Sequence, residues 1–383
     1  MSPRKQVLGL IAICLGFALA ISGCGGGGGE AGSDDEIIIG AAAPMTGKYG
    51  EMGNDLLAAI RIAVDERNAA GGIDGKQIRL VIEDDKASPK DAVTVAHKMV
   101  ADSRIIGLVG HMNSGTTLPA SAVYHDGGMA MVMPVPTNPD ITKQGFDNLF
   151  RVPITDDKQG PACVAFMLEK LEKRNIAVVH NKQAYGEGIA TEARKALEAS
   201  GNDPLTYMGV SADDQDYRAV ITQLKQLGPD AVFFGGGYSE AAILIKQSRE
   251  QGFDVPFVMG DGCFDSQLME IAGPAADGCY ISNIAPTTAP GEKAEAFFTK
   301  FLEEHGKIVA FAPLGYVSTN ILLDAVDTAE SKTREGVLAA LRDPAFSFDS
   351  ILGEIAFVEN GDSRGQTAFM HLIEDGQFKT VDW

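Results

Sequence analysis

The chain has 383 residues, of which 45% are hydrophobic and 22% charged, and its formal net charge is −20. This length exceeds what a single hydrophobic core usually supports, so we expect two globular domains. Nucleic acid is excluded as a natural partner, because phosphate binding needs clustered Lys and Arg side chains and this chain is strongly acidic.

Residues 1–23 are predicted to be an export signal. Arg4 and Lys5 precede an apolar stretch, residues 7–21, that is too short for an easy membrane span of about 20 residues. The stretch ends in Ile21-Ser22-Gly23-Cys24, which resembles the lipobox of bacterial lipoproteins. That resemblance implies cleavage before Cys24 and attachment of a lipid to this cysteine.

Residues 24–35 are predicted to be a flexible tether. The segment is rich in glycine and then acidic, with no large apolar side chain to bury. A flexible chain of this length reaches roughly 20 Å. The segment therefore belongs to neither domain.

The three cysteines of the remaining chain, Cys163, Cys263 and Cys279, form no CxxC pair and no cluster with histidine. We therefore expect no metal site. In an oxidising compartment Cys263 and Cys279 could form a disulfide or remain free thiols, and the spacing leaves both alternatives open.

From Glu36 onward, strand-like and helix-like segments alternate, which predicts parallel sheets covered by helices on both faces. The first run contains predicted strands at residues 37–39, 78–82, 105–109 and 130–133. A second run begins near Asp156, with predicted strands at residues 176–179, 205–210, 231–234, 256–259 and 279–282. The chain is thus predicted to contain two complete α/β units.

The last hundred residues contain further helix-like and strand-like segments. A helix at residues 296–304 is followed by a break at Pro313–Gly315 and by a helix with apolar residues at positions 317, 321, 322 and 326. Two strands, residues 369–373 and 378–381, flank an Asp375-Gly376 turn and predict a hairpin. No long linker separates the units, so the chain can cross between them more than once.

Ligands of open α/β sheets bind beyond the carboxyl ends of the strands, so the loops at these ends are the candidate site. The loop after residues 105–109 carries Ser114, Thr116 and Thr117 at the start of a helix. These hydroxyls and the free N–H groups of the helix start predict either an anion site or simple helix capping. Asp261 follows another strand, where we expect a partly solvated carboxylate.

No catalytic or nucleotide motif is found in the sequence. The Gly235-Gly236-Gly237 run has neither GxGxxG nor GxxxxGK[ST] spacing, and no GxSxG, HExxH or SxxK set is present. The six histidines are scattered, which favours structural or surface roles. We therefore expect a protein that is not an enzyme, with no catalytic residue, no cofactor and no metal.

Taken together, the strand-end loops resemble those of the branched-chain amino-acid-binding proteins, the leucine/isoleucine/valine-binding family of type I periplasmic binding proteins. The resemblance covers nearly all of residues 36–383 and rests on several motifs in the same order. These motifs are Gly71-Gly72-Ile73, Asp84-Asp85, Gly110-His111, the loop 134–139, Gln159-Gly160-Pro161 and Lys182-Gln183-Ala184-Tyr185-Gly186-Glu187-Gly188.

The resemblance implies a fold of two doubly wound α/β lobes joined by a three-strand hinge. Lobe 1 would comprise residues 36–153 and about 285–350, and lobe 2 residues 154–284 and about 355–383. The lobes are expected to close on a ligand by movement at the hinge.

The resemblance also implies the ligand-binding residues. Ser114 and Thr137 match hydroxyls that bind a ligand carboxylate, and Val135 matches a backbone contact. Asp261 matches the acidic position that takes the ligand ammonium, where the familiar branched-chain proteins carry glutamate. Tyr49 and Tyr185 match aromatic residues of the pocket, and either Gly237 or Tyr238 occupies a further pocket position in the second lobe.

The implied function is that of the extracytoplasmic substrate-binding protein of an ABC importer. It would capture a free amino acid of the branched-chain class between its lobes and deliver it to permease subunits in the membrane. It would act as a monomer held by a lipid on the periplasmic or cell-surface face of a bacterial membrane. Two alternatives stay open: a sensory ligand-binding protein of the same fold, and a binder of another amino acid, an amide or a small carboxylate.

Overall fold

The computed structural model describes residues 36–287, 291–306, 311–365 and 367–383. The predicted signal, the tether and Cys24 lie outside these residues. No helix of the described chain is long and apolar enough to cross a membrane.

The first half of the chain forms a parallel five-stranded sheet with the order β2-β1-β3-β4-β5. We call the part of the molecule built on this sheet lobe 1. Its strands are β1 (Glu36–Ala43), β2 (Gln77–Asp84), β3 (Ile105–Gly110), β4 (Ala130–Met133) and β5 (Leu149–Arg151). The helices that follow these strands are α1 (Gly50–Ala69), α2 (Pro89–Ala101), α3 (Ser114–Asp126) and α4 (Asp140–Lys143).

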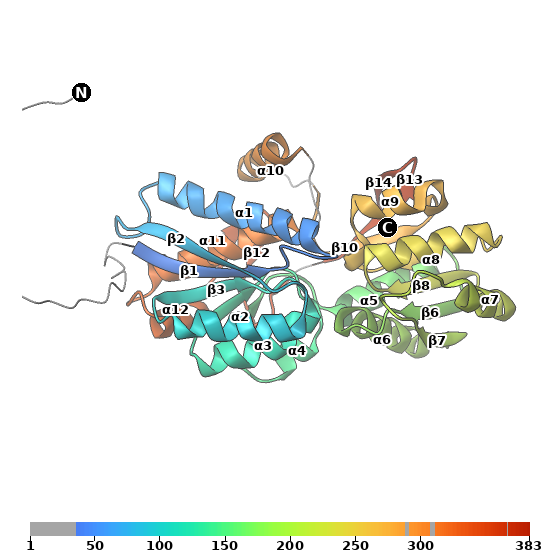
Figure 1. Ribbon diagram of the computed structural model, residues 1–383, viewed down its shortest axis with the longest axis horizontal. Helices are drawn as coiled ribbons and strands as arrows, with labels where there is room; N and C mark the ends of the chain where they lie inside the picture. The colour runs from blue at the N-terminus through green and yellow to red at the C-terminus, as the bar shows by residue number, and fades with distance from the viewer. Residues whose placement is uncertain (1–35, 288–290, 307–310, 366) are drawn as a thin grey trace, which may run out of the picture. The chain divides into compact units, whose positions relative to one another are not determined.

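Successive side chains of a strand point to opposite faces of the sheet, and both faces of β1 are buried. Ile37 and Ile39 pack into one hydrophobic cluster with α1 and α11 (Ala312–Thr328), whereas Ile38 packs into another with α2 and α3. Figure 1 shows α1 on one side of this sheet and α2 and α3 on the other. The prediction of a sheet covered on both faces is confirmed.

The second sheet has seven strands in the order β14-β13-β10-β9-β8-β6-β7, and we call the part built on it lobe 2. Its parallel strands are β6 (Ile176–His180), β7 (Thr206–Gly209), β8 (Ala231–Gly235), β9 (Phe257–Met259) and β10 (Tyr280–Asn283). The antiparallel hairpin of β13 (Phe369–Glu374) and β14 (Gln377–Val381) extends it beside β10. Asp375 and Gly376 both have positive φ, which confirms the predicted turn.

Helices cover both faces of this second sheet as well. One face is covered by α5 (Asp156–Ala165), which continues into a π-helical turn at Phe166–Lys170, and by α6 (Ala184–Ala199). The other is covered by α7 (Arg218–Leu227), α8 (Tyr238–Glu250) and α9 (Ser266–Ala272). Two 3₁₀ turns, Asp261–Cys263 and Gly273–Ala276, lie beside α9 in the chain.

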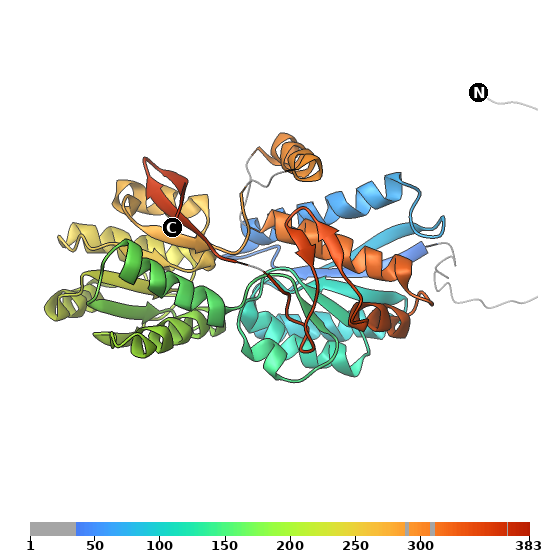
Figure 2. The ribbon, with the colours of Figure 1, turned by 180° about the vertical axis from the view of Figure 1, so that it is seen from behind.

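The chain passes between the sheets three times: from β5 to α5, from β10 to α10 (Glu292–His305), and from β12 (Gly353–Ile355) to β13. Figure 2 shows the last of these segments, which leads from the small hairpin of β11 (Phe348–Ser350) and β12 into lobe 2. Between the second and third crossings, α10, α11 and α12 (Arg334–Arg342) return to lobe 1. Two doubly wound sheets with a three-strand connection confirm the predicted fold class.

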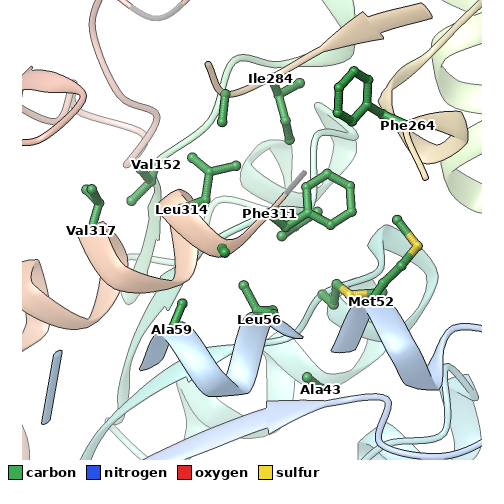
Figure 3. Close-up of a cluster of buried hydrophobic side chains, with 14 of the residues drawn as sticks. Ala43, Met52, Leu56, Ala59, Val152, Phe264, Ile284, Phe311, Leu314 and Val317 are labelled. Carbon is green, nitrogen blue, oxygen red and sulfur yellow. The ribbon is translucent and has the colours of Figure 1, made fainter. Parts of the chain in front are cut away.

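The predicted break at Pro313–Gly315 is wrong, because both residues lie inside α11. Proline is tolerated there because it stands in the first helical turn, where its missing N–H has no partner to lose. Gly315 permits close approach to α1, since a Cβ atom at this position would stand 2.7 Å from Leu56 Cδ1. Figure 3 shows the resulting cluster, in which Phe311 and Leu314 lie between Leu56 of α1 and Ile284.

Candidate functional site: a cavity between the strand ends

A cavity of about 740 Å³, measured with its opening to solvent, lies where the strand-end loops of the two sheets meet. Six of the seven predicted ligand-binding residues line it. They are Tyr49, Ser114, Val135, Thr137, Tyr185 and Asp261. The parallel strands bring these loops together because their carboxyl ends lie at one edge of each sheet.

The start of α3 forms one polar wall of the cavity. Ser114 is the first helical residue, and its Oγ accepts a 3.3 Å hydrogen bond from the Asn138 backbone N–H, so its hydroxyl hydrogen is left to donate. The first N–H groups of a helix have no acceptor within the helix, and the helix dipole makes this end attractive to an anion. The wall can therefore hold a carboxylate.

The threonine hydroxyls of the same loop are not part of this wall. Thr116 Oγ1 and Thr117 Oγ1 each donate to the Asn113 carbonyl oxygen at 2.8 Å. These bonds run back to a carbonyl oxygen and cap no N–H group, and the helix start has no side-chain cap, so the capping alternative is wrong for the two threonines. Among the described residues no donor reaches the buried Asn113 Oδ1, which belongs to a cavity-lining residue that sequence reasoning missed.

Asp261 forms the acidic wall. It begins the 3₁₀ turn after β9 and is only 3% exposed, so the expectation of a partly solvated carboxylate is wrong. Tyr185 Oη donates to Asp261 Oδ1 at 2.8 Å and accepts from the Gly262 N–H at 3.0 Å. Burial raises the pKa of Asp261 to about 6, against the lowering effect of the hydrogen bonds from Tyr185 and Gln159.

The glycines beside Asp261 make room for Tyr185. A Cβ atom at Gly260 would stand 2.3 Å from Tyr185 Oη, and one at Gly262 would stand 2.6 Å from its Cε1. The tyrosine ring therefore lies directly on this stretch of backbone. Its hydroxyl is fixed between the carboxylate and an N–H group.

A second buried carboxyl, Asp156, lies near Asp261 at the start of α5. Burial raises its pKa well above the usual range for aspartate, and the charge of Asp261 adds to this effect. Asp156 Oδ2 would stand 3.1 Å from a Cβ atom at Gly188. Two carboxyl groups whose pKa values burial raises thus lie close together behind this wall.

The two residues of the open alternative, Gly237 and Tyr238, lie differently with respect to the cavity. Gly237 lines the cavity, and a Cβ atom there would stand 2.5 Å from Tyr49 Oη. Tyr238 is not among the described residues that line it, and its assignment as a ligand-binding residue stays a prediction. Its hydroxyl instead donates to the Lys48 carbonyl oxygen at 2.8 Å, because α8 begins at Tyr238 and directs its side chain to that loop.

The apolar part of the cavity wall includes Met52, Met112 and Phe311, none of which the sequence pattern identified. Met52 comes from α1, Met112 from the loop after β3, and Phe311 from the residue before α11. Their segments are widely separated in the chain. Of the three, Met112 alone could have been predicted from the sequence, because it stands two residues before Ser114 in a loop that was already a candidate for the site.

A buried network holds two of the wall segments together. His111 Nδ1 lies 2.6 Å from Asp85 Oδ2, and its Nε2 lies 3.1 Å from Tyr124 Oη. Asp85 Oδ1 also accepts from the Ala87 N–H at 2.8 Å. Since Ala87 and Met112 line the cavity on either side of this network, His111 has the structural role expected of it.

Cys163, Cys263 and Cys279 are buried free thiols, so the disulfide alternative is excluded. Cys263 Sγ instead donates to the Gly236 carbonyl oxygen, and Cys279 Sγ accepts from Arg249. Within the described ranges no group of three His, Cys, Asp or Glu side chains is placed to hold a metal ion.

Comparisons with known proteins agree with this architecture. A profile of the periplasmic binding protein family matches residues 36–377. A "Leu/Ile/Val-binding protein homolog 2" from Brucella abortus is 34% identical over 327 residues, which are 85% of this chain and 87% of that protein. A "Leucine-, isoleucine-, valine-, threonine-, and alanine-binding protein" from Pseudomonas aeruginosa is 37% identical over 331 residues, 86% of this chain and 87% of that one.

Among solved structures, the leucine binding protein LivK from Thermotoga maritima superposes with a TM-score of 0.85 at 26% identity, covering 90% of this chain and 98% of LivK. The substrate-binding protein LivJ from Streptococcus pneumoniae, solved in complex with isoleucine, gives a TM-score of 0.82 at 27% identity and covers 90% of this chain and 99% of LivJ. The chain therefore belongs to the periplasmic binding protein family, among its Leu/Ile/Val-binding homologues.

Proposed function

We propose that the protein is the extracytoplasmic substrate-binding protein of an ABC importer and that it captures a free amino acid of the branched-chain class. The observation that carries the proposal is the pairing, in one cavity, of an anion-binding helix start with a buried carboxylate. A zwitterion is the ligand that satisfies both. Family membership supports the transport role.

The ligand carboxylate would bind at the start of α3. Ser114 Oγ donates to it, together with the N–H groups of the first helical turn, and Thr137 supplies a second hydroxyl. Val135 contributes a backbone contact from the neighbouring loop. Hydrogen bonds to a charged group are stronger than neutral ones, especially when the lobes exclude water.

The ligand ammonium would bind Asp261. Tyr185 holds this carboxylate in place through one of its oxygens, and because a carboxylate has about four lone-pair sites, the group can also accept from the ligand. A cation beside Asp261 lowers its pKa again and offsets the cost of its burial. Binding of the ammonium thus depends on an ionised Asp261.

The ligand side chain would pack against Met52, Met112 and Phe311, with the rings of Tyr49 and Tyr185 nearby. Such a wall has no charged partner for a polar side chain, which favours leucine, isoleucine and valine. Methionine side chains adapt to several shapes, so we expect more than one member of this class to bind. The names of the relatives both include leucine, isoleucine and valine, and one of them adds threonine and alanine, so they support this ligand class.

Closure of the lobes around the ligand would create the form that permease subunits recognise. No bond is made or broken, so the protein acts as a binder and not as an enzyme. It works as a monomer outside the cytoplasm, tethered by a lipid on Cys24.

Titration calorimetry against the twenty common amino acids tests the proposal. The protein is refolded from denaturant beforehand, because purified binding proteins often retain ligand. We expect one-to-one binding of leucine, isoleucine and valine and no binding of 4-methylpentanoate, which is leucine without its amino group. If no amino acid binds, or if 4-methylpentanoate binds as well as leucine, the proposal is wrong.

A further inference from the structure

The loop between β1 and α1 belongs to lobe 1 and is fixed there by Asp84. The Met45 N–H donates to Asp84 Oδ1 at 2.8 Å, and Thr46 Oγ1 donates to Asp84 Oδ2 at 2.6 Å. Asn54 Nδ2 also donates to the Met45 carbonyl oxygen at 3.0 Å. The loop is therefore a well-supported projection of lobe 1.

The far end of this loop contacts lobe 2 through a set of four residues that we call the clasp: Lys48, Tyr49, Tyr238 and Glu240. Lys48 Nζ lies 2.8 Å from Glu240 Oε1, and Tyr238 Oη donates to the Lys48 carbonyl oxygen at 2.8 Å. The rings of Tyr49 and Tyr238 meet edge to face with centroids 6.3 Å apart. Two lobes are thus joined by an ion pair, a hydrogen bond and an aromatic contact.

Glu240 is a buried charge whose other partners in the described part of the chain, Asn181 and Ser239, come from lobe 2. Its side chain is 1% exposed, whereas that of Lys48 is 33% exposed. Asn181 Nδ2 donates to Glu240 Oε1 at 3.0 Å, and Ser239 Oγ donates to Oε2 at 3.0 Å. These neutral donors satisfy the carboxylate without neutralising it, so its negative charge remains available to a cation from lobe 1.

The clasp stands directly behind the cavity wall. Tyr49, Asn181 and Gly237 line the cavity, and each of them contacts a clasp residue or belongs to the clasp. A Cβ atom at Gly237 would stand 3.0 Å from Glu240 Oε2 as well as against Tyr49. The position of Tyr49 in the wall therefore depends on the same contacts that join the lobes.

We propose that Lys48 and Glu240 are positioning residues that hold the lobes together around the ligand without touching it. The proposal rests on the function proposed above and adds two residues to its binding mechanism. When the lobes separate, Lys48 returns to water while Glu240 keeps its partners in lobe 2. A contact made only in the closed arrangement raises affinity by favouring that arrangement, and its loss acts mainly on dissociation.

The test compares Lys48→Met and Glu240→Gln with the wild type in leucine binding at 20 and 300 mM NaCl. We expect the dissociation constant of each variant to rise about 3- to 10-fold at low salt, chiefly through faster dissociation. Salt should weaken the wild type and leave Lys48→Met nearly unaffected, because only the wild type has the pair to screen. The double variant should be no weaker than the weaker single variant.

Lys143→Met is the matched control. Lys143 pairs with Asp140 at 3.3 Å within the short helix α4, and both side chains are exposed. Lys143→Met makes the same change of charge as Lys48→Met but removes no contact between the lobes. Its affinity for leucine and the salt dependence of that affinity should therefore equal those of the wild type.

If Lys48→Met binds leucine with wild-type affinity and wild-type salt dependence, the proposed role of the clasp is wrong. Additive effects in the double variant would also contradict it. If Glu240→Gln does not fold, Lys48→Met and Tyr238→Phe decide the matter, because Lys48 is partly exposed and Tyr238→Phe removes only the hydroxyl. If the wild type binds no amino acid, the proposed function fails, but small-angle scattering still tests the clasp. Lys48→Met should then have a larger radius of gyration than the wild type. Equal radii would refute the proposed role of the clasp.

Discussion

Asp261→Asn should change ligand affinity and protein stability in opposite directions. The carboxylate is 3% exposed, and burial raises its pKa from 3.8 to about 6. An ionised group in this position opposes folding until a cation joins it. Removing the charge should therefore stabilise the ligand-free protein and deprive the ligand ammonium of its partner.

The cost of the buried charge follows from the shift in pKa. Two units at 1.36 kcal/mol each correspond to about 3 kcal/mol of lost stability when Asp261 is fully ionised. Because the pKa is raised in the folded state, this cost is absent below about pH 4, grows between pH 4 and 6, and is constant above that range. Asparagine keeps an acceptor for Tyr185 but buries an amide group, so we expect a net gain of about 1 to 2 kcal/mol at pH 7.

The effect on binding has the other sign. Leaving the ligand ammonium without its partner in a closed site should cost roughly 2 to 5 kcal/mol. Since about 1.4 kcal/mol corresponds to a factor of ten, the affinity for leucine should fall more than tenfold. The variant should also lose most of its discrimination against 4-methylpentanoate.

Urea unfolding at pH 4 and pH 7 and calorimetry with leucine measure the two effects. Asp277→Asn is the matched control, because Asp277 is exposed in the same lobe and should affect neither quantity. Binding within twofold of the wild type would mean that Asp261 is not the ammonium partner. A variant less stable than the wild type at pH 7, with the deficit absent at pH 4, would refute the electrostatic argument.

Three further predictions address the polar walls and the anchor. The affinity of the wild type for leucine should fall up to tenfold per pH unit below about pH 6, because Asp261 must lose its proton to bind the ammonium; a flat profile from pH 4.5 to 8 would contradict this. Ser114→Ala should weaken leucine binding by about 1.5 to 3 kcal/mol, the value of a hydrogen bond to a charged group, with an unchanged affinity as the opposing result. Cys24→Ser should release the protein from membranes into the soluble fraction, and unchanged partitioning into detergent would exclude the lipid anchor.

Most strands were predictable because they carry a short apolar run bounded by turn residues, whereas β5 and β11 were not predicted. The run at residues 130–133 coincides with β4, and that at residues 176–179 falls one residue short of β6. The break at Pro313–Gly315 was mispredicted because the same residues that end a helix also suit its first turn or a close helix contact. Local sequence does not distinguish these roles.

Many of the cavity-lining residues could also be predicted from the sequence. Parallel strands place the loops that follow them at one edge of the sheet, however the side chains pack. Ser114 and Asp261 were found in this way, and the family resemblance added Thr137 and Tyr49. The burial of Asp261, and hence its raised pKa, was not found. It depends on Tyr185, which lies 76 residues away in the chain and covers the carboxylate.

The sequence by itself determined the order of strands and helices, the two α/β units and the loops that carry the site, because the periodicity of apolar residues and the turn residues act locally. Only the tertiary structure decided that Gly237 and not Tyr238 lines the cavity, that the cysteines stay free, and that Lys48 meets Glu240 across the lobes. Tyr238 and the Lys48 carbonyl are 190 positions apart. Such contacts arise from how two separately folded sheets dock, and no local pattern of residues encodes that arrangement.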